Sequence, residues 1–530
     1  MKTGNRIVSD GMVLQRGKDF VLTGSGKKDE KVRAVFSGTA LRDTVSGDRK
    51  SVELKCETRC ANNTYEICFP NLPAGGPYEL LIMCGKNVTK VSDILVGDVF
   101  FMSGQSNMEL DVNWIYHSFQ EEIDSFACHA IRQFKVPIDY NFDRVQEDVS
   151  GGRWVSAAGE SKMSFGAIGF FMAKKLYETN HIPIGLIQTA VPGCPIESFL
   201  TKENVSLYQN IKLPQACHSR EAMKAQIEKE LSEWQLRVDQ MMEEDRKASL
   251  SDEQNVVVPI LLENKREPAG IYTFRKCVRL PENPVQDAVL HLGILIEADV
   301  TYVNNVLVGQ TEYQYPPRRY VMPKEILHKG ENEIVVKLLA TNGVGRFWEK
   351  QKYELELGDT SYDLTGVWQF RKGCFSSEAF FAKTFFEYFP YGVYNAMLAP
   401  LMDYPVRAVL WYQGESNTGD PDRYYEKMKT LIQQFRVQMG QSVPFYYVQL
   451  AYYEDPADLD GRGWETIRRE QERVQDITDT HMIISGDVGS ATDLHPQNKK
   501  AIGERMAKLL SIESEQTSDT YERKSETGKK

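Results

Sequence analysis

The chain has 530 residues, of which 42% are hydrophobic, 26% charged and 11% aromatic; this globular composition and length predict about three or four domains. Its net charge of −11 is spread along the sequence, which argues against nucleic acid or an anionic membrane surface as a partner. There is no run of about 18 apolar residues, so no membrane-spanning helix is predicted.

Residues 1–92 are predicted to form an N-terminal β-sandwich of short strands separated by Gly- and Pro-rich turns. Residues 1–6 lack the apolar stretch of a signal peptide, so none is expected in this chain. The location stays open: periplasmic or secreted if such a peptide was removed, and cytoplasmic otherwise. The predicted strands are residues 12–15, 20–23, 31–36, 65–69 and 78–83.

The nine cysteines are sparse and odd in number, which argues against a disulfide scaffold. Four of them could suggest zinc, but their spacing lacks close C-x₂-C pairs and the residues between them alternate as in strands. We therefore predict no metal site. The four are Cys56, Cys60, Cys68 and Cys84.

From residue 93 the pattern alternates between strand and helix, which predicts the first part of an α/β domain over 93–254. An apolar run from Ile94 to Met102 predicts a buried strand that ends at a Ser-Gly turn just before Ser106. The stretch up to about residue 160 is expected to be loop-rich. Later predicted elements are a helix near 168–176, a strand at 184–187 and a charged helix at 218–247, whose apolar stripe is Met223, Ile227, Leu231, Trp234 and Val238.

Residues 255–383 are again rich in strand patterns and are predicted to form an inserted β domain. This stretch resembles the sugar-binding jelly-roll domain of family-two glycosidases through residues 302–309, 330–333 and 364–368.

The α/β pattern resumes over 384–513, the predicted second part of the same domain, and residues 514–530 read as a disordered polar tail. The predicted elements are a helical stretch at 395–401, strands at 406–412, 445–450 and 481–485, and helices at 424–439, 464–474 and 499–511.

Ser106 lies where α/β folds place reactive groups, just past the carboxyl end of a strand and at the start of a helix. The first N–H groups of a helix are free to bind a developing oxyanion. The same pattern also fits a strand and turn with Ser106 or Asn107 as a helix cap. A serine nucleophile needs a base, and His495, in a loop after Asp493, is the best placed of the eight histidines; the alternative is a capping histidine in a turn.

Three motifs in this order resemble the SGNH (GDSL-like) hydrolases, and more closely the sialate O-acetylesterases. They are Gly-Gln-Ser-Asn-Met at 104–108, Trp-Tyr-Gln-Gly-Glu-Ser-Asn at 411–417 and Asp-Leu-His-Pro at 493–496. The resemblance implies a three-layer α/β/α hydrolase fold with a parallel sheet, an N-terminal β-sandwich and an inserted jelly roll. It also implies a serine esterase that removes acetyl groups from O-acetylated sialic acid and uses no cofactor.

In this family Ser106 would be the nucleophile and His495 the base. Most SGNH enzymes carry the acid three residues before the histidine, where this chain has Thr492. The Asp-x-His-Pro form points instead to Asp493, with Asp487 as the alternative; a backbone carbonyl could also orient the imidazole ring.

The resemblance also implies an oxyanion hole made by the backbone N–H groups of Ser106 and Gly193 and by the side chain of Gln413, where most of the superfamily uses Asn. Asn417 competes with Gln413 for that role. Glu415 is expected to be a buried structural acid. The predicted substrate-binding residues are Gln105, Asn107, Glu415 and Asn417.

Sialic acid carries a carboxylate, which an arginine could bind through two parallel hydrogen bonds. Four arginines are candidates for this role, although any one of them could instead form a structural ion pair. Two alternatives stay open for the function: an acetylesterase for another acetylated glycan such as xylan, and a non-catalytic carbohydrate-binding protein. The candidate arginines are Arg153, Arg407, Arg468 and Arg469.

Overall fold

A computed structural model describes residues 1–41, 49–247, 253–264, 266–312, 314, 317–349, 351–358, 360–379, 383–440, 442–454, 461–491 and 493–512. The expected polar tail at 514–530 and Thr492 lie outside these residues. Contacts divide the chain into two compact units. Unit 1 comprises Met1–Ile115, Glu121–His218 and Phe385–Lys530, and unit 2 comprises Tyr116–Gln120 and Ser219–Thr384.

A central sheet, parallel except for its last strand, forms the core of unit 1. The middle strand is β7 (Asn87–Gly104). Strands from before residue 219 lie on one side of it, and strands from after residue 384 lie on the other side. In such sheets the carboxyl ends of the strands next to this switch form the usual binding position. The strand order is β26 (Thr480–Ile483), β25 (Phe445–Val448), β24 (Ala408–Tyr412), β7 (Asn87–Gly104), β10 (Ile184–Gln188), β8 (Cys128–Lys135) and β9 (Trp154–Ala157).

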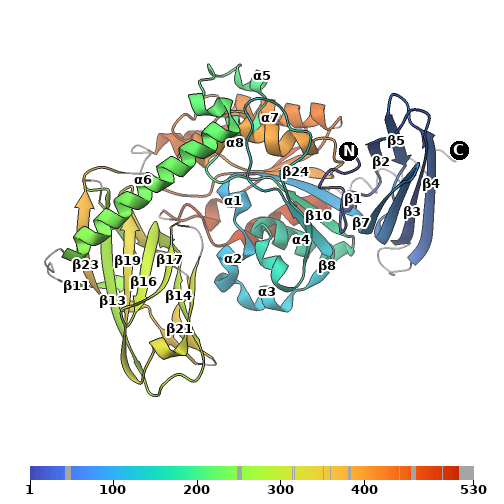
Figure 1. The fold of residues 1–530 in the computed structure, drawn as a ribbon. Helices are drawn as coiled ribbons and strands as arrows, with labels where there is room; N and C mark the ends of the chain where they lie inside the picture. Colours follow the sequence, from blue (N-terminus) through green and yellow to red (C-terminus); the bar gives the residue numbers. More distant parts are fainter. Residues whose placement is uncertain are drawn as a thin grey trace. The chain divides into compact units, whose positions relative to one another are not determined.

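Helices cover both faces of this sheet, with α4 (Ala167–Asn180) on one side and α7 (Tyr424–Gln438) and α8 (Arg462–Arg473) on the other (Figure 1). Successive side chains of a strand point to opposite faces, and β7 follows this rule. Its Phe101 ring lies 5.6 Å from that of Phe435 in α7, whereas its Met102 side chain packs against Gly169 in α4. Both faces of β7 are therefore buried from Ile94 onward, as its apolar run predicts. The remaining helices of unit 1 include α1 (Ser106–Glu109), α2 (Val112–Ile115) and α5 (Lys202–Val205); α3 spans Gln120–Ser125.

The N-terminal strands are continuous with the central sheet, because the first half of β7 pairs with β6 and its second half pairs with β10 and β24. The expected domain boundary at residue 92 therefore falls inside one strand. The predicted strands before residue 84 are present, and β4 is an addition that the sequence analysis missed. These strands are β1 (Val13–Gln15), β2 (Phe20–Ser25), β3 (Lys31–Leu41), β4 (Arg49–Arg59), β5 (Thr64–Phe69) and β6 (Gly75–Cys84).

Unit 2 consists mainly of antiparallel strands whose apolar faces share one core, which includes Phe274, Leu290, Leu355 and Trp368. The six-stranded sheet runs β11 (Gln254–Val258), β23 (Gly366–Ser376), β13 (Ala269–Leu280), β19 (Gly330–Ala340), β16 (Ala298–Val303) and β17 (Val306–Thr311). A four-stranded sheet runs β18 (Arg318–Met322), β14 (Ala288–Gly293), β21 (Tyr353–Leu357) and β22 (Thr360–Asp363). A three-stranded sheet runs β12 (Ile260–Glu263), β20 (Val344–Phe347) and β15 (Leu295–Ile296).

The long helix α6 (Arg220–Lys247) belongs to unit 2, so this unit begins ahead of the expected boundary at residue 255. Trp234, Val238 and Met241 of α6 pack on Ile271 and Leu339 of the six-stranded sheet. Leu231, which we expected in the apolar stripe, is 39% exposed. The helix contacts the sheet through its C-terminal half, so its apolar positions there decide the packing.

The nine cysteines are free thiols, and Cys60 Sγ lies 4.0 Å from Cys84 Sγ. No helix in the described part of the chain combines the length and apolar character needed to cross a bilayer.

Candidate active site

Ser106 is the first residue of α1 and follows directly on β7, as the sequence predicts. The turn between them requires Gly104, whose φ is +126° and where an added Cβ would lie 2.1 Å from the carbonyl oxygen of Tyr412 in β24. The Gln105 N–H donates to that same carbonyl at 2.8 Å. The close approach of β24 thus fixes the turn that presents the serine.

The structure brings His495 to this serine across most of the chain. His495 Nε2 lies 2.8 Å from Ser106 Oγ, and both residues are buried. The Trp114 ring contacts the imidazole edge-on, with 5.8 Å between ring centroids. A serine hydroxyl within hydrogen-bond reach of an imidazole nitrogen is the arrangement in which the imidazole can remove the hydroxyl proton.

The surroundings of His495 keep its ring in the form that a base requires. Burial, together with the positive charge of Lys499, lowers the pKa of His495 to about 3. Near neutral pH the imidazole therefore carries no net charge, and Nε2 is able to accept the Ser106 proton.

Of the two candidate acids, Asp493 is held against the histidine loop. Its Oδ1 accepts the backbone N–H of His495 at 2.9 Å, which curls the loop. Asp487 is mostly exposed and forms a two-point ion pair with Arg505, with Oδ1 2.7 Å from Nη1 and Oδ2 2.5 Å from Nη2. The geometry therefore favours Asp493 over Asp487.

The loop after β10 lies beside the nucleophile, because the Val191 N–H donates to the Gly104 carbonyl at 2.9 Å. Gly193 in this loop has φ +73°, and a Cβ there would lie 2.0 Å from the Tyr388 hydroxyl oxygen, so only glycine fits. Among the described residues, the backbone N–H groups of Ser106 and Gly193 donate to no protein acceptor. These two groups are free to hold an oxyanion.

Gln413 does not present a free amide hydrogen. Its Nε2 donates to the Cys194 carbonyl at 3.3 Å and to Asn417 Oδ1 at 2.7 Å, and the side chain is fully buried. The expected oxyanion donor is therefore committed to protein acceptors. The competitor Asn417 is committed too, since its Nδ2 donates to Glu197 Oε2 at 3.0 Å and its Oδ1 also accepts the Ile196 N–H. These buried polar side chains thus form hydrogen bonds with the neighbouring loops.

The other predicted substrate-binding residues are also turned inward. Asn107 Nδ2 donates to Glu415 Oε1 at 2.5 Å, and both side chains are buried. Gln105 Oε1 accepts the N–H groups of Gly414 at 3.4 Å and Ser416 at 3.3 Å. These residues connect the segments of the site to one another, which fits the expectation that Glu415 is a buried structural acid, while their contact with substrate stays a prediction.

The four candidate arginines separate by position. Arg407 precedes β24, at the end of the strand opposite to the catalytic turn, and its Nη1 pairs with Asp98 at 2.8 Å. Arg468 of α8 is half-buried and donates to the Leu450 carbonyl, just beyond the carboxyl end of β25. Arg153 and Arg469 are exposed. Arg407 is thus structural. Arg468 and Arg153 both lie at the carboxyl edge of the sheet, Arg468 beside β25 and Arg153 at the start of the antiparallel strand β9, and Arg468 is the half-buried one of the two.

One buried residue beside the site was not singled out from the sequence. Lys499 is fully buried, and its Nζ donates to Asn107 Oδ1. A lysine at the start of a polar helix reads as a solvated residue, and the only signal in the sequence is its position four residues after His495.

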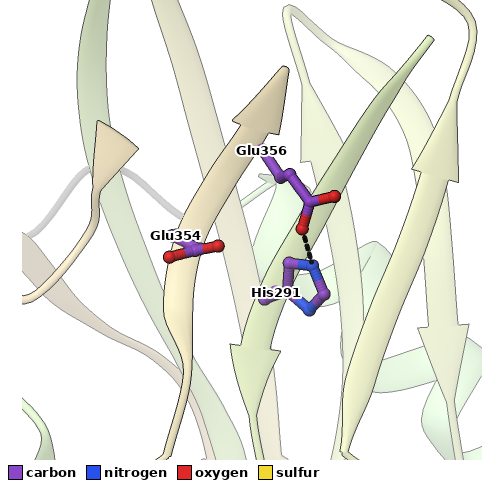
Figure 2. A group of neighbouring side chains, drawn as sticks. All are labelled: His291, Glu354 and Glu356. Atoms are coloured by element: carbon purple, nitrogen blue, oxygen red, sulfur yellow. Dashed lines mark hydrogen bonds and ion pairs between the residues drawn. The ribbon is translucent and has the colours of Figure 1, made fainter. Parts of the chain in front are cut away.

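Within the described part of the chain, the only group of three side chains with metal-ligand geometry lies in unit 2. His291, Glu354 and Glu356 offer ligand atoms within 4.8 Å of one another, and Figure 2 shows His291 bonded to Glu356. Lys352 Nζ lies 2.5 Å from Glu354 Oε1 and 3.0 Å from Glu356 Oε2. The lysine already balances the two carboxylates, so this group does not require a metal ion.

Residues 381–511 match the family model described as carbohydrate esterase, sialic acid-specific acetylesterase. The sialate O-acetylesterase of Rattus norvegicus is 29% identical over 146 residues, which cover 26% of this chain and 27% of that protein. The enzyme of the same name from Homo sapiens is 29% identical over 150 residues, covering 26% of this chain and 28% of that protein. The chain thus matches little more than a quarter of the length of these curated relatives.

Among solved structures, a carbohydrate acetylesterase from Xanthomonas citri aligns with a TM-score of 0.55 at 20% identity, covering 95% of this chain and 73% of that one. This likeness concerns the fold. Together with the sequence matches, it confirms the predicted resemblance to the sialate O-acetylesterases and an α/β esterase fold.

Proposed function

We propose that this chain is a serine esterase that hydrolyses the O-acetyl esters of sialic acids and releases acetate. The observation that carries the proposal is the 2.8 Å contact between Ser106 Oγ and His495 Nε2. The family match at 381–511 contains His495 but not Ser106. Through this contact, Ser106 can act as nucleophile with the histidine of the matched segment. This pairing supports catalysis over a purely carbohydrate-binding role.

In the first half of the reaction, Ser106 Oγ attacks the acetyl carbonyl carbon while His495 Nε2 takes the hydroxyl proton. The carbonyl π electrons move to the oxygen, and the N–H groups of Ser106 and Gly193 stabilise the resulting oxyanion. When the oxyanion collapses, the bond to the sugar oxygen breaks. His495 returns its proton to that oxygen, and the acetyl group stays on Ser106.

In the second half, a water molecule attacks the acetyl-serine carbonyl and gives a proton to His495. The tetrahedral species then breaks at the Ser106 oxygen, which recovers the proton from His495, and acetic acid leaves and ionises to acetate in solvent. Asp493 keeps the loop of His495 in place through both halves. Every proton in this scheme is carried by the imidazole, so the scheme calls for neither a metal nor an organic cofactor.

The preference for sialic acid rests on the sequence similarity, because an acetyl ester is common to many glycans. A sialate site should present a cation to the sugar carboxylate, and Arg468 is the best placed of the four candidates. Its guanidinium could bind that carboxylate through two parallel hydrogen bonds.

The test compares kcat/KM for 9-O-acetylated sialic acid with that for acetylated xylo-oligosaccharide. We expect a preference for the sialate, and we expect Arg468→Met to raise KM for the sialate alone, while the neighbouring exposed Arg469→Met changes neither substrate. A preference for the xylan fragment would reduce the function to a general carbohydrate acetylesterase. Absence of turnover on any ester would leave the non-catalytic alternative.

A further inference from the structure

A buried lysine connects the segment of the nucleophile with the loop of the base. Lys499 begins the helix at 499–512, and its Nζ donates to the side chain of Asn107, the residue after Ser106. We propose that Lys499 and Asn107, together with Glu415, are positioning residues that hold Ser106 and His495 in register. This inference rests on the proposed esterase function.

Asn107 joins the two halves of the site through one side chain. Its Nδ2 donates to the Leu494 carbonyl at 3.1 Å as well as to Glu415 Oε1 at 2.5 Å. Leu494 directly precedes His495, so the amide next to the nucleophile holds the backbone next to the base. Since proton transfer requires the 2.8 Å contact between Ser106 and His495, a shift of either segment would slow the reaction.

Lys499 fixes the orientation of that amide. By donating to Oδ1, its ammonium group leaves Nδ2 directed at Leu494 and Glu415 and prevents the amide from turning over. Burying a lysine is costly, and lysines are almost never fully buried unless paired. Here the carboxylates of Asp493 and Glu415 offset the cost, and they oppose the burial that lowers the pKa of Lys499 to about 8.

The lysine also acts on the base electrostatically. The groups around its Nζ are Asn107, Asp493, Glu415, His495 and the ring of Tyr412, whose centroid is 5.9 Å away. Its positive charge opposes protonation of the imidazole. Replacing Lys499 by a neutral side chain of similar length would therefore change both the geometry and the charge that the base experiences.

The experiment measures the rate at which a fluorophosphonate labels Ser106, which reports activation of the nucleophile without any sugar substrate. In Lys499→Met we expect labelling to slow by about 10²-fold at neutral pH, as for a small misplacement of reacting groups. We also expect the acid limb of the labelling rate to move to higher pH, because the positive charge no longer opposes protonation of His495. A solely structural role would not move that limb.

The matched control is Lys500→Met. Lys500 is the next residue of the same helix, its side chain is 28% exposed, and its Nζ pairs with Glu122 at 2.5 Å, so its loss should leave labelling unchanged. Asn107→Asp is a second variant: it keeps the acceptor for Lys499 but loses the donor to Leu494, so labelling should slow comparably. Melting temperatures are measured for all three.

Several outcomes would overturn the inference. Labelling of Lys499→Met at the wild-type rate with an unmoved acid limb would reject it while leaving the esterase proposal intact. Failure of both Lys499→Met and Asn107→Asp to fold would assign these residues to stability instead. If wild-type Ser106 is not labelled at all, the esterase proposal falls, and this inference falls with it.

Discussion

At the scale of single residues, the imidazole of His495 sets the lower pH limit of activity. The base must be neutral, and its pKa is lowered from 6.5 to about 3 by burial and by the charge of Lys499. A lowered pKa means that protonation sets in only at lower pH. We therefore expect kcat/KM for p-nitrophenyl acetate to persist well below pH 6.5 when it is measured between about pH 4 and pH 8. An acid limb centred near 6.5 would show that His495 is more solvated than the structure has it.

The two aspartates give a second prediction at this scale. Asp493→Asn keeps an oxygen that can accept the His495 N–H but loses the negative charge, so kcat should fall, though less than in His495→Ala. Asp487→Asn breaks only an exposed pair with Arg505 and should leave kcat unchanged. Steady-state kinetics of the three variants measures these losses in kcat. A larger loss of kcat in Asp487→Asn than in Asp493→Asn would assign the role of the acid to Asp487.

The two residues proposed to carry the chemistry could be singled out from the sequence, whereas the contacts of the residues around them could not. Each of the two has a local signal in the sequence. Ser106 stands where a strand and a turn lead into a helix, and His495 lies in a loop shortly after an acid. The roles of Gln413 and Asn417 depend on which acceptors approach them from Cys194, Ile196 and Glu197. Those partners are more than 200 residues away in the chain, and no local pattern encodes such contacts.

At the scale of elements, the packing of α6 gives a stability prediction. Trp234 is buried against the six-stranded sheet, so Trp234→Ala should lower the free energy of unfolding of unit 2 by about 3–5 kcal/mol. Leu231→Ala, on the exposed side of the same helix, should change it by no more than about 0.5 kcal/mol. Urea unfolding followed by circular dichroism measures both, and equal effects would mean that α6 does not pack through Trp234.

Strands and helices with strong periodicity or a continuous apolar run could be predicted, among them β7, β10, α4 and α7. In unit 1 the strands missed were β4, β8 and β9. Strand β4 is rich in charged residues and lies at the edge of its sheet, so its alternation carries few strongly apolar side chains and is easily overlooked. Strand β8 contains His129 and Arg132, and Arg132 is buried through bonds to the carbonyls of Gly11 and Asp93, which only the folded chain supplies.

At the scale of the whole molecule, the scheme for catalysis predicts that chelators leave the esterase activity unchanged. The proton transfers run between Ser106, His495, the leaving sugar oxygen and water, and the carboxylates of Glu354 and Glu356 are already balanced by Lys352 in unit 2. Activity after dialysis against EDTA should therefore equal that of the untreated protein. Loss of activity that a divalent ion restores would contradict the scheme.

The succession of α/β, β-rich and again α/β segments could be predicted, but the limits between them could not. The expected limit at residue 92 disappears because β7 pairs with β6 before it joins the parallel sheet. The expected limit at 255 moves to Ser219 because α6 finds its apolar partners in strands far ahead in the sequence. The periodicity of apolar residues identifies a helix or strand, whereas the elements that it packs against decide the unit to which it belongs.

The central claim is that Ser106 is the nucleophile of an esterase acting on O-acetylated sialic acid. The most direct test is acetate release from 9-O-acetylated sialic acid by the wild-type protein and by Ser106→Ala, with circular dichroism to confirm that both are folded. We expect turnover by the wild type and, in the variant, a loss of about 10⁶-fold in kcat, as when a nucleophile is removed from a catalytic unit. Release of acetate at the wild-type rate by folded Ser106→Ala would contradict it.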